Sequence, residues 1–300
     1  RNSFTNKKSK FMTSIKIEIK VPNYIKQMAT KLNEAGFLSY LVGGSLRDTL
    51  IGREPKDWDI ATNALPEEIQ KIFPESVYEN QFGTVGVKID SIDANENGIV
   101  EITTFRSEGE YKDSRHPNQI IFVKNIEADL SRRDFTVNAF AAKWDGKNFS
   151  EIIDPFSGAL DLDKKIIRAV LDPNARFQED ALRLMRAIRL STELGFKIEI
   201  KTLEAIKLNA SKLKLVSIER IRDEFTRIIS ADNAVQGVNL LEDSGLLQYI
   251  MPELREGIGV GQNLHHIYSV WEHNLRALNY TVKKNYSLII SLIYLPIIFF

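Results

Sequence analysis

The chain has 300 residues, 43% of them apolar, and its 40 lysines and arginines balance 40 aspartates and glutamates. This length allows one large domain or two to three smaller ones, and the charge balance excludes an overall field that would draw the chain onto nucleic acid or an anionic membrane. The absence of cysteine excludes disulfides, thiolate zinc sites and a cysteine nucleophile, and it agrees with the reducing cytoplasm that we predict as the location.

Both ends of the chain have an unusual composition. Residues 1–11 are polar and basic and precede Met12, the first methionine, so we predict that they are disordered. Residues 285–300 include an apolar run of about 15 residues, which is shorter than the roughly 20 needed to span a bilayer. We expect a buried helix there, or the product of a truncation or frameshift, and no membrane partner.

Short helices and strands alternate in the first half of the chain. Residues 23–37 have apolar side chains at helical spacing, and Gly36 is a plausible cap; residues 38–44 form a β-like run that two glycines stop. The elements predicted next are a helix at 45–52, a strand at 57–62, a helix at 65–73 that begins at Pro66, and a strand pair at 83–89 and 98–105. These elements predict a mixed α/β head over residues 12–150.

The pattern becomes helical in the second half. Apolar residues at helical spacing dominate from residue 172 to residue 250, and no repeat or flexible linker separates this part from the head. The predicted fold class is therefore α+β, with a mixed sheet and helices in the head, followed by an all-α neck and body. We predict a neck at 151–210, a helical body at 211–255 and a further helical region at 256–300.

Asp57 and Asp59 stand two residues apart in the predicted strand 57–62. Residues i and i+2 of a strand point to the same face, so the two carboxylates would lie side by side and repel each other. Solvation, or pairing with Lys56 or Arg53, would relieve this repulsion. A divalent cation, Mg²⁺, would relieve it as well, because it takes oxygen ligands and commonly joins one or two carboxylates to substrate phosphates.

The residues that precede this pair favour the metal. Gly43 and Gly44 allow the backbone to approach a ligand closely, and the helix that follows offers free N–H groups suited to phosphate. Arg47, one turn into that helix, adds a bidentate phosphate donor. Together these features describe a metal–triphosphate site in which two metals align an attacking hydroxyl with a leaving pyrophosphate.

Glu101 is the candidate for a third acid. In the predicted strand 98–105, alternation places Glu101 on the same face as Thr103 and on the opposite face from Ile102. An acid at the start of an apolar strand fits a catalytic carboxylate, and it fits an edge-strand charge equally well.

Four motifs carry a family resemblance. The segment LVGGSLRDTLIGREPKDWDIAT (41–62) resembles the signature of the class II tRNA nucleotidyltransferases, the CCA-adding enzymes, within the polymerase-β-like superfamily. SRRDFTVNAFA (131–141) is similar to the second motif of the family, and IDPFSGALDLDKKIIRAV (153–170) to the segment that joins head and neck. RFQEDALRLMRAIRLSTELGF (176–196) is similar to the nucleotide-selecting helix. The resemblance runs in order from about residue 22 to 280.

The selecting helix also has a chemical rationale. Its apolar residues are predicted on one face, and its charged residues lie opposite at steps of three: Asp180, Arg183, Arg186 and Arg189. An ordinary solvated face with i,i+3 pairs has the same pattern. Cytosine and adenine each offer an amino donor beside a ring-nitrogen acceptor, so a carboxylate next to an arginine fits C and A and rejects G and U.

The resemblance implies roles for individual residues. It implies base selection by Asp180 and Arg183, and metal binding by Asp57 and Asp59. Further nucleotide contacts are implied for Gly44, Arg47, Arg133, Arg186 and Arg189. Arg132 and Asp134, which flank Arg133, could instead be local ion-pair partners.

Several members of the family remain as alternatives. Poly(A) polymerases share the head, but their usual GRRF-like stretch is replaced here by ENQFGTVGVKI (79–89). The polar segment FRSEGEYKDSRHP (105–117) has the composition of a mobile loop, which favours CCA addition over CC addition. His273 lies in a segment that resembles the start of an HD-type domain, but no histidine follows it. We therefore predict a truncated HD-like region at 256–300 without a second metal site.

The predicted function is addition of CMP and AMP, from CTP and ATP, to the 3′ end of tRNA with release of pyrophosphate. Basic residues in KLNASKLKL (207–215) and RIRDEFTR (220–227) would hold the tRNA acceptor arm, or they belong to exposed amphipathic helices. An A-adding enzyme or poly(A) polymerase is the alternative of the same family. The alternative outside the enzymes is a truncated, catalytically impaired product that binds tRNA.

Overall fold

The computed structural model describes residues 19–80, 83–90, 92–93, 97–108, 120–261 and 267–283. The predictions for residues 1–11 and 285–300 lie outside these ranges. The chain divides into two compact units. The first unit comprises Arg1–Phe105 and Phe140–Asp154, and the second comprises Arg106–Ala139 and Pro155–Phe300. Residues 106–108 and 120–139, which we predicted within the head, thus belong to the helical unit.

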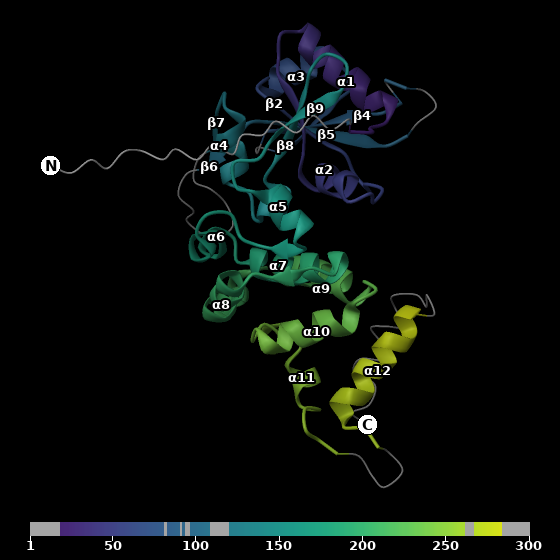
Figure 1. Ribbon diagram of the computed structural model, residues 1–300, viewed down its shortest axis with the longest axis vertical. Coiled ribbons are helices and arrows are strands. Elements are labelled where there is room, and N and C mark those ends of the chain that lie inside the picture. Colours follow the sequence, from purple (N-terminus) through teal and green to yellow (C-terminus); the bar gives the residue numbers. More distant parts are fainter. Residues whose placement is uncertain are drawn as a thin grey trace, which may run out of the picture. The chain divides into compact units, whose positions relative to one another are not determined.

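A seven-stranded sheet forms the centre of the first unit (Figure 1). Its order is β3-β4-β5-β2-β1-β8-β9, with β2 and β5 parallel and all other neighbours antiparallel. The strands are β1 (Ser39–Val42), β2 (Asp59–Thr62), β3 (Val77–Asn80), β4 (Thr84–Lys88), β5 (Ile99–Thr104), β8 (Ala141–Trp144) and β9 (Phe149–Ile153). The mixed sheet that the sequence predicts is confirmed.

Three helices flank this sheet: α1 (Asn23–Glu34), α2 (Gly43–Leu50) and α3 (Pro66–Ile72). α1 buries Ile25, Met28 and Leu32 at helical spacing, and the chain then turns through Gly36 at a φ of 87°. α3 begins at Pro66 as predicted. α1 and α3 pack against each other, whereas α2 packs on β1, β2 and β8.

The sequence analysis missed some of the strands. The pair β4 and β5 is present where the alternation indicates it, but β3, β8 and β9 were missed. The turn between β8 and β9 carries a recognisable signal, because Asp145 and Gly146 form a hairpin dipeptide. The Asp145 carboxylate accepts the backbone N–H groups of Lys147 (2.9 Å) and Asn148 (2.8 Å), which closes the turn.

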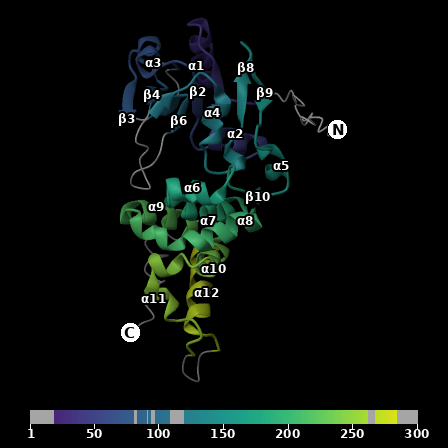
Figure 2. The same cartoon turned by 90° about the vertical axis from the view of Figure 1, so that its left-hand side faces the viewer.

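The second unit is mainly helical (Figure 2). Its longest helices are α7 (Leu182–Leu194), α9 (Ile218–Ile229) and α12 (Val270–Lys283). The other helical elements are α4 (Ile126–Ser131), η1 (Thr136–Asn138), α5 (Gly158–Asp163), α6 (Pro173–Glu179), α8 (Ile200–Asn209), η2 (Ala210–Leu215), α10 (Ala234–Asp243), η3 (Leu247–Tyr249) and α11 (Pro252–Arg255). No helix within the described ranges combines the length and the apolar character needed to cross a bilayer.

Two small sheets interrupt the helices of this unit. β6 (Arg106–Glu108) pairs antiparallel with β7 (Ile120–Phe122), and β10 (Ile166–Ile167) pairs parallel with β11 (Lys197–Ile198). Each strand has only two or three residues, too few for alternation to appear in the sequence. The α+β class is confirmed, and β10 and β11 are strands within the part that we predicted to be all-α.

The predicted selecting helix is in fact two helices. α6 ends at Glu179 and α7 begins at Leu182, because Asp180 adopts an extended backbone with φ −142° and ψ 108°. The Asp180 carboxylate accepts the N–H of Leu182 at 3.0 Å and so caps the new helix. Asp180 therefore does not lie on the charged face of a continuous helix, and that part of the prediction is wrong.

Gly237 of α10 is closely packed against α7 and α9. A Cβ atom added there would lie 2.6 Å from Thr192 Oγ1 in α7 and 2.7 Å from Ile228 Cγ2 in α9. Alanine would gain about 1 kcal/mol of helix propensity but lose about 1–3 kcal/mol to overpacking. We expect Gly237→Ala to lower the free energy of unfolding in urea by about 1 kcal/mol, whereas Gly261→Ala, with no atom within 4 Å, leaves it unchanged. A Gly237→Ala variant as stable as the wild type would contradict this packing.

Candidate active site

The glycine pair leads directly into a helix. α2 begins at Gly43, whose φ of 71° is in the left-handed region that suits glycine. Ser45 in the first turn donates its hydroxyl to Val42 O at 2.8 Å and accepts the N–H of Asp59 at 3.5 Å. The start of α2 is thus joined to the start of β2. The sequence analysis missed Ser45, although a hydroxyl directly after a glycine pair is a usable signal.

Asp57 and Asp59 differ in their surroundings. β2 begins at Asp59, and Asp57 lies in the bend before it, so the prediction that one strand carries both acids is wrong. Asp57 is exposed, whereas Asp59 is half-buried. The strand begins later because pairing with β1 reaches only as far as Ile60 and pairing with β5 only as far as Asp59.

The sheet places Glu101 beside Asp59. The parallel register of β2 and β5 pairs Asp59 with Glu101, and neighbouring strands lie about 4.7–4.9 Å apart. Glu101 is exposed while Val100 and Ile102 on either side of it are buried, as the alternation predicts. On its other side Glu101 faces Gly86 of β4, which has no side chain. Two of the three predicted acids therefore lie next to each other.

These carboxylates fit a divalent cation only in part. Exposed carboxylate oxygens on neighbouring strands are suitable ligands for a hard cation. Among the described residues, however, no group of three or more histidine, cysteine, aspartate or glutamate side chains is close enough to hold a metal ion. Mg²⁺ commonly takes only one or two carboxylates and completes its shell with water and substrate phosphates. The donor set fits that mode of binding.

Arg47 lies under the glycine pair and is buried. Its Nε donates a hydrogen bond to Asp48 Oδ1 at 2.9 Å, and its Nη2 donates one to Asp48 Oδ2 at 3.0 Å. Its Nη2 atom lies 3.5 Å from the position that a Cβ atom on Gly44 would occupy. A Cβ atom at Gly44 would therefore make only an ordinary contact with the guanidinium, and Asp48 orients that group.

The arginines of the second motif share one buried acid. This acid is Asp129, which is 1% exposed. Its Oδ1 accepts a hydrogen bond from Arg132 Nη2 at 2.8 Å, and its Oδ2 accepts one from Arg133 Nη2 at 3.2 Å. Asp134 is also buried and accepts Arg186 Nε at 2.7 Å. Arg132 pairs locally with Asp129, as the alternative predicts. For Asp134 the predicted local pairing is wrong, because its partner is Arg186, 52 residues away.

Asp180 and Arg183 each have another partner. Asp180 Oδ2 accepts Arg220 Nη2 at 2.7 Å, so α9 supplies an arginine that the sequence analysis had assigned to a tRNA-holding segment. Arg183 donates to Glu179 Oε2 at 2.5 Å and to the carbonyl oxygen of Arg132 at 3.1 Å. The predicted base acceptor Asp180 and base donor Arg183 are three positions apart in the chain. Arg220 orients Asp180, and Glu179 orients Arg183.

Arg189 is buried rather than solvated. Its side chain is 5% exposed, and it donates Nε to Glu224 Oε2 at 2.6 Å and Nη1 to Glu193 Oε2 at 2.7 Å. α7 is buried around most of its circumference by α9, α10 and α6. These contacts favour a packing role, and the nucleotide contact implied for Arg189 stays a prediction.

Two buried aspartates make the second unit sensitive to acid. Burial alone would raise the pKa of Asp129 and of Asp134, but the neighbouring arginines outweigh it and hold the pKa of both carboxyls below the usual range. A carboxyl whose pKa is lowered by folding contributes stability that is complete above its unfolded pKa of about 3.9 and is lost as the pH falls below that value.

We therefore expect the free energy of unfolding in urea to decrease as the pH is lowered from about 5 to about 2. The Asp134→Asn variant lacks one of the two carboxyl groups. Its free energy of unfolding should therefore change less than that of the wild type over the same pH range. An equally steep dependence in that variant would show that Asp134 does not contribute.

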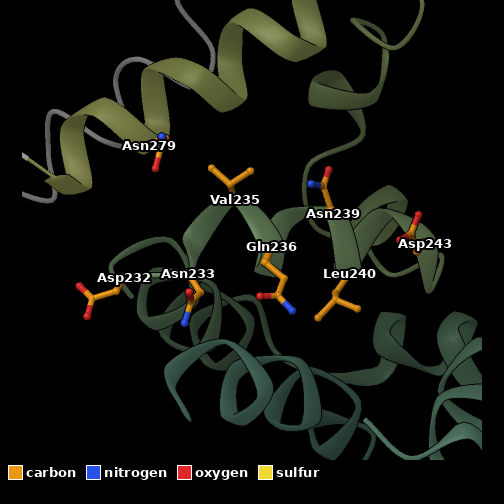
Figure 3. Close-up of a pocket in the computed structure, with 8 residues that line it drawn as sticks. All are labelled: Asp232, Asn233, Val235, Gln236, Asn239, Leu240, Asp243 and Asn279. Atoms are coloured by element: carbon orange, nitrogen blue, oxygen red, sulfur yellow. The ribbon is translucent and has the colours of Figure 1, made fainter. Parts of the chain in front are cut away.

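A separate polar cavity of about 440 Å³ lies between α10 and α12 (Figure 3). It is lined by Asp232, Asn233, Val235, Gln236, Asn239, Leu240, Asp243 and Asn279. None of these is a predicted site residue, so this cavity does not form part of the candidate active site.

Comparison with known proteins agrees with this arrangement. Residues 39–168 match the poly A polymerase head domain, and residues 195–258 match the probable RNA and SrmB-binding site of polymerase A. The chain is 43% identical to the CCA-adding enzyme of Geobacillus thermodenitrificans over 227 residues, which are 75% of this chain and 54% of the relative. It is 39% identical to that of Leuconostoc mesenteroides, covering 85% of this chain and 63% of the relative.

Solved structures give the same result. The crystal structure of the Bacillus stearothermophilus CCA-adding enzyme in complex with CTP matches with a TM-score of 0.69 and 33% identity, over 87% of this chain and 58% of that one. The Thermotoga maritima CCA-adding enzyme complexed with tRNA shares the fold, with a TM-score of 0.71 at 21% identity. The chain spans between about half and two thirds of the length of these curated relatives.

The mixed sheet with an acidic strand pair, together with the match of residues 39–168 to the poly A polymerase head domain, defines a nucleotidyltransferase-type protein. The two matched regions together cover more than half of the residues. The chain belongs to the family of class II tRNA nucleotidyltransferases and poly(A) polymerases. Nucleotidyltransferases of this family generally use divalent metal ions.

Proposed function

We propose that the chain is a CCA-adding nucleotidyltransferase, which transfers CMP and AMP from CTP and ATP to the 3′ end of tRNA. The observation that carries this proposal is the in-register pairing of Asp59 with Glu101, next to the helix that the glycine pair begins. The identity of 43% with a CCA-adding enzyme supports it. A cysteine-free composition supports a cytoplasmic location.

Asp57 and Asp59 would hold Mg²⁺, which supplies charge neutralisation at the α-phosphate and at the leaving pyrophosphate. The glycine pair lets the backbone N–H groups of α2 approach the triphosphate, and Arg47, oriented by Asp48, adds positive charge. The carboxylate of Glu101 accepts the proton of the attacking 3′-hydroxyl. The 3′-oxygen then forms a bond to the α-phosphorus as the bond to pyrophosphate breaks.

Asp180 and Arg183 select the base in this proposal. The Asp180 carboxylate accepts the exocyclic amino group of C or A, and Arg183 donates to the neighbouring ring nitrogen. Arg220 and Glu179 hold the two side chains in place. Arg133, Arg186 and Arg189 complete the proposed nucleotide contacts, with Asp129, Asp134 and Glu224 as their respective acidic partners.

The test is incubation of the chain with Mg²⁺, labelled CTP, ATP or both, and a tRNA that ends before CCA. Addition of C, C and A in that order is the expected product pattern on a sequencing gel. The poly A polymerase description of the head match favours a second candidate, a poly(A) polymerase, which would produce a long A tail from ATP alone. Folded protein that adds no nucleotide to the tRNA or to an acceptor-arm minihelix would overturn both.

A further inference from the structure

Asp129 connects two parts of the second unit through one buried carboxylate. Besides Arg132 and Arg133 it accepts the backbone N–H of Arg106 at 3.3 Å. Arg106 is the first residue of β6, and α4, which carries Asp129, packs against this strand (Figures 1 and 2). The carboxylate therefore ties the start of the β6–β7 hairpin to the arginine pair that follows α4.

The two arginines are more exposed than the aspartate that they share. The side chains of Arg132 and Arg133 are 16% and 18% exposed, whereas Asp129 beneath them is 1% exposed. Asp129 thus lies beneath two guanidinium groups, which are the more accessible part of the cluster. Guanidinium groups carry donors in the planar geometry that phosphate oxygens accept.

Arg133 depends on Asp129 for its orientation. Apart from Nη2–Asp129, its guanidinium makes only a 3.4 Å bond from Nη1 to Asn138 O among the described residues, and its Nε is buried without a hydrogen-bond partner there. Loss of the carboxylate would leave the longer bond alone. A guanidinium held by one long bond samples several orientations.

We propose that Asp129 is a positioning residue that holds Arg133 in the orientation in which it contacts the nucleotide. This inference rests on the proposed function, since it takes Arg133 to contact the nucleotide. Asp129 acts through Arg133 and has no contact of its own with the substrate.

Asp129→Asn tests this proposal because it keeps the size of the side chain and removes its charge. We expect kcat for CMP addition to fall by about 10–100-fold, since misplacement by about 1 Å has that effect. KM for CTP should change by less than about threefold, because the uncompensated arginines still attract the triphosphate. Asp129→Glu, which restores the charge, should recover part of kcat, and Asp145→Asn, in the β8–β9 turn, should leave it unchanged.

A second readout does not depend on turnover. The Nε–H resonance of Arg133, assigned by comparison with Arg133→Lys, should be sharp and slowly exchanging in the wild type and broadened in Asp129→Asn. A resonance that stays sharp, or a kcat that is unchanged in Asp129→Asn, would overturn the positioning role. A wild-type chain that adds no nucleotide would overturn the proposed function instead, and Asp129 would then be a structural residue only.

Discussion

Asp59→Asn is expected to abolish nucleotide addition, with a loss of at least about 10³-fold in kcat, the upper range for removal of one charge-stabilising group from an active site. Asp59 is half-buried at the start of β2, its N–H is held by Ser45, and the register places Glu101 beside it. The substitution keeps the shape and removes one negative charge from the proposed metal site. The circular dichroism spectrum and the unfolding midpoint should remain those of the wild type.

Asp57→Asn and the double variant Asp57→Ala/Asp59→Ala refine this test. If both acids hold one metal, their effects are not additive, and the double variant should be about as slow as Asp59→Asn alone. Asp163→Asn, an exposed aspartate of α5, is the matched control and should keep full activity. Nucleotide addition by Asp59→Asn at more than about a tenth of the wild-type rate would exclude Asp59 as a metal ligand.

Glu224→Ala is expected to lower the free energy of unfolding by about 3–5 kcal/mol, which is the cost of leaving a buried charge without its partner. Glu224 and Arg189 are 10% and 5% exposed in their side chains and are joined at 2.6 Å. Glu193 also accepts a hydrogen bond from Arg189 but bonds Arg227 as well, so it compensates only in part. Urea unfolding followed by circular dichroism measures the loss, and a change below about 1 kcal/mol would contradict a buried pair.

The double variant Arg189→Met/Glu224→Leu separates the two roles of Arg189. Apolar residues of similar volume replace a buried ion pair at little cost, so most of the stability should return. If Arg189 only packs α7 against α9, the double variant keeps its kcat and its KM for CTP. A folded double variant with greatly reduced nucleotide addition would instead support the contact that the family resemblance implies.

Local signals in the sequence were sufficient for part of the fold. Helical spacing predicted α1, Pro66 marked the start of α3, and alternation predicted the facing of Glu101 in β5, because these signals depend only on residues a few positions apart. The hairpin of β8 and β9 was missed although Asp145 and Gly146 indicate it. The break at Asp180 was missed because an aspartate that caps the following helix can equally continue the preceding one.

The sequence by itself determined the family, the two-part architecture and the residue types of the candidate site, since these are properties of contiguous motifs such as 41–62 and 131–141. Only the tertiary structure decided which groups meet. The register places Asp59 beside Glu101, Arg186 reaches Asp134 across 52 residues and Arg220 reaches Asp180 across 40. Strand register and buried ion pairs depend on how distant segments pack, and that information is absent from the spacing of neighbouring residues.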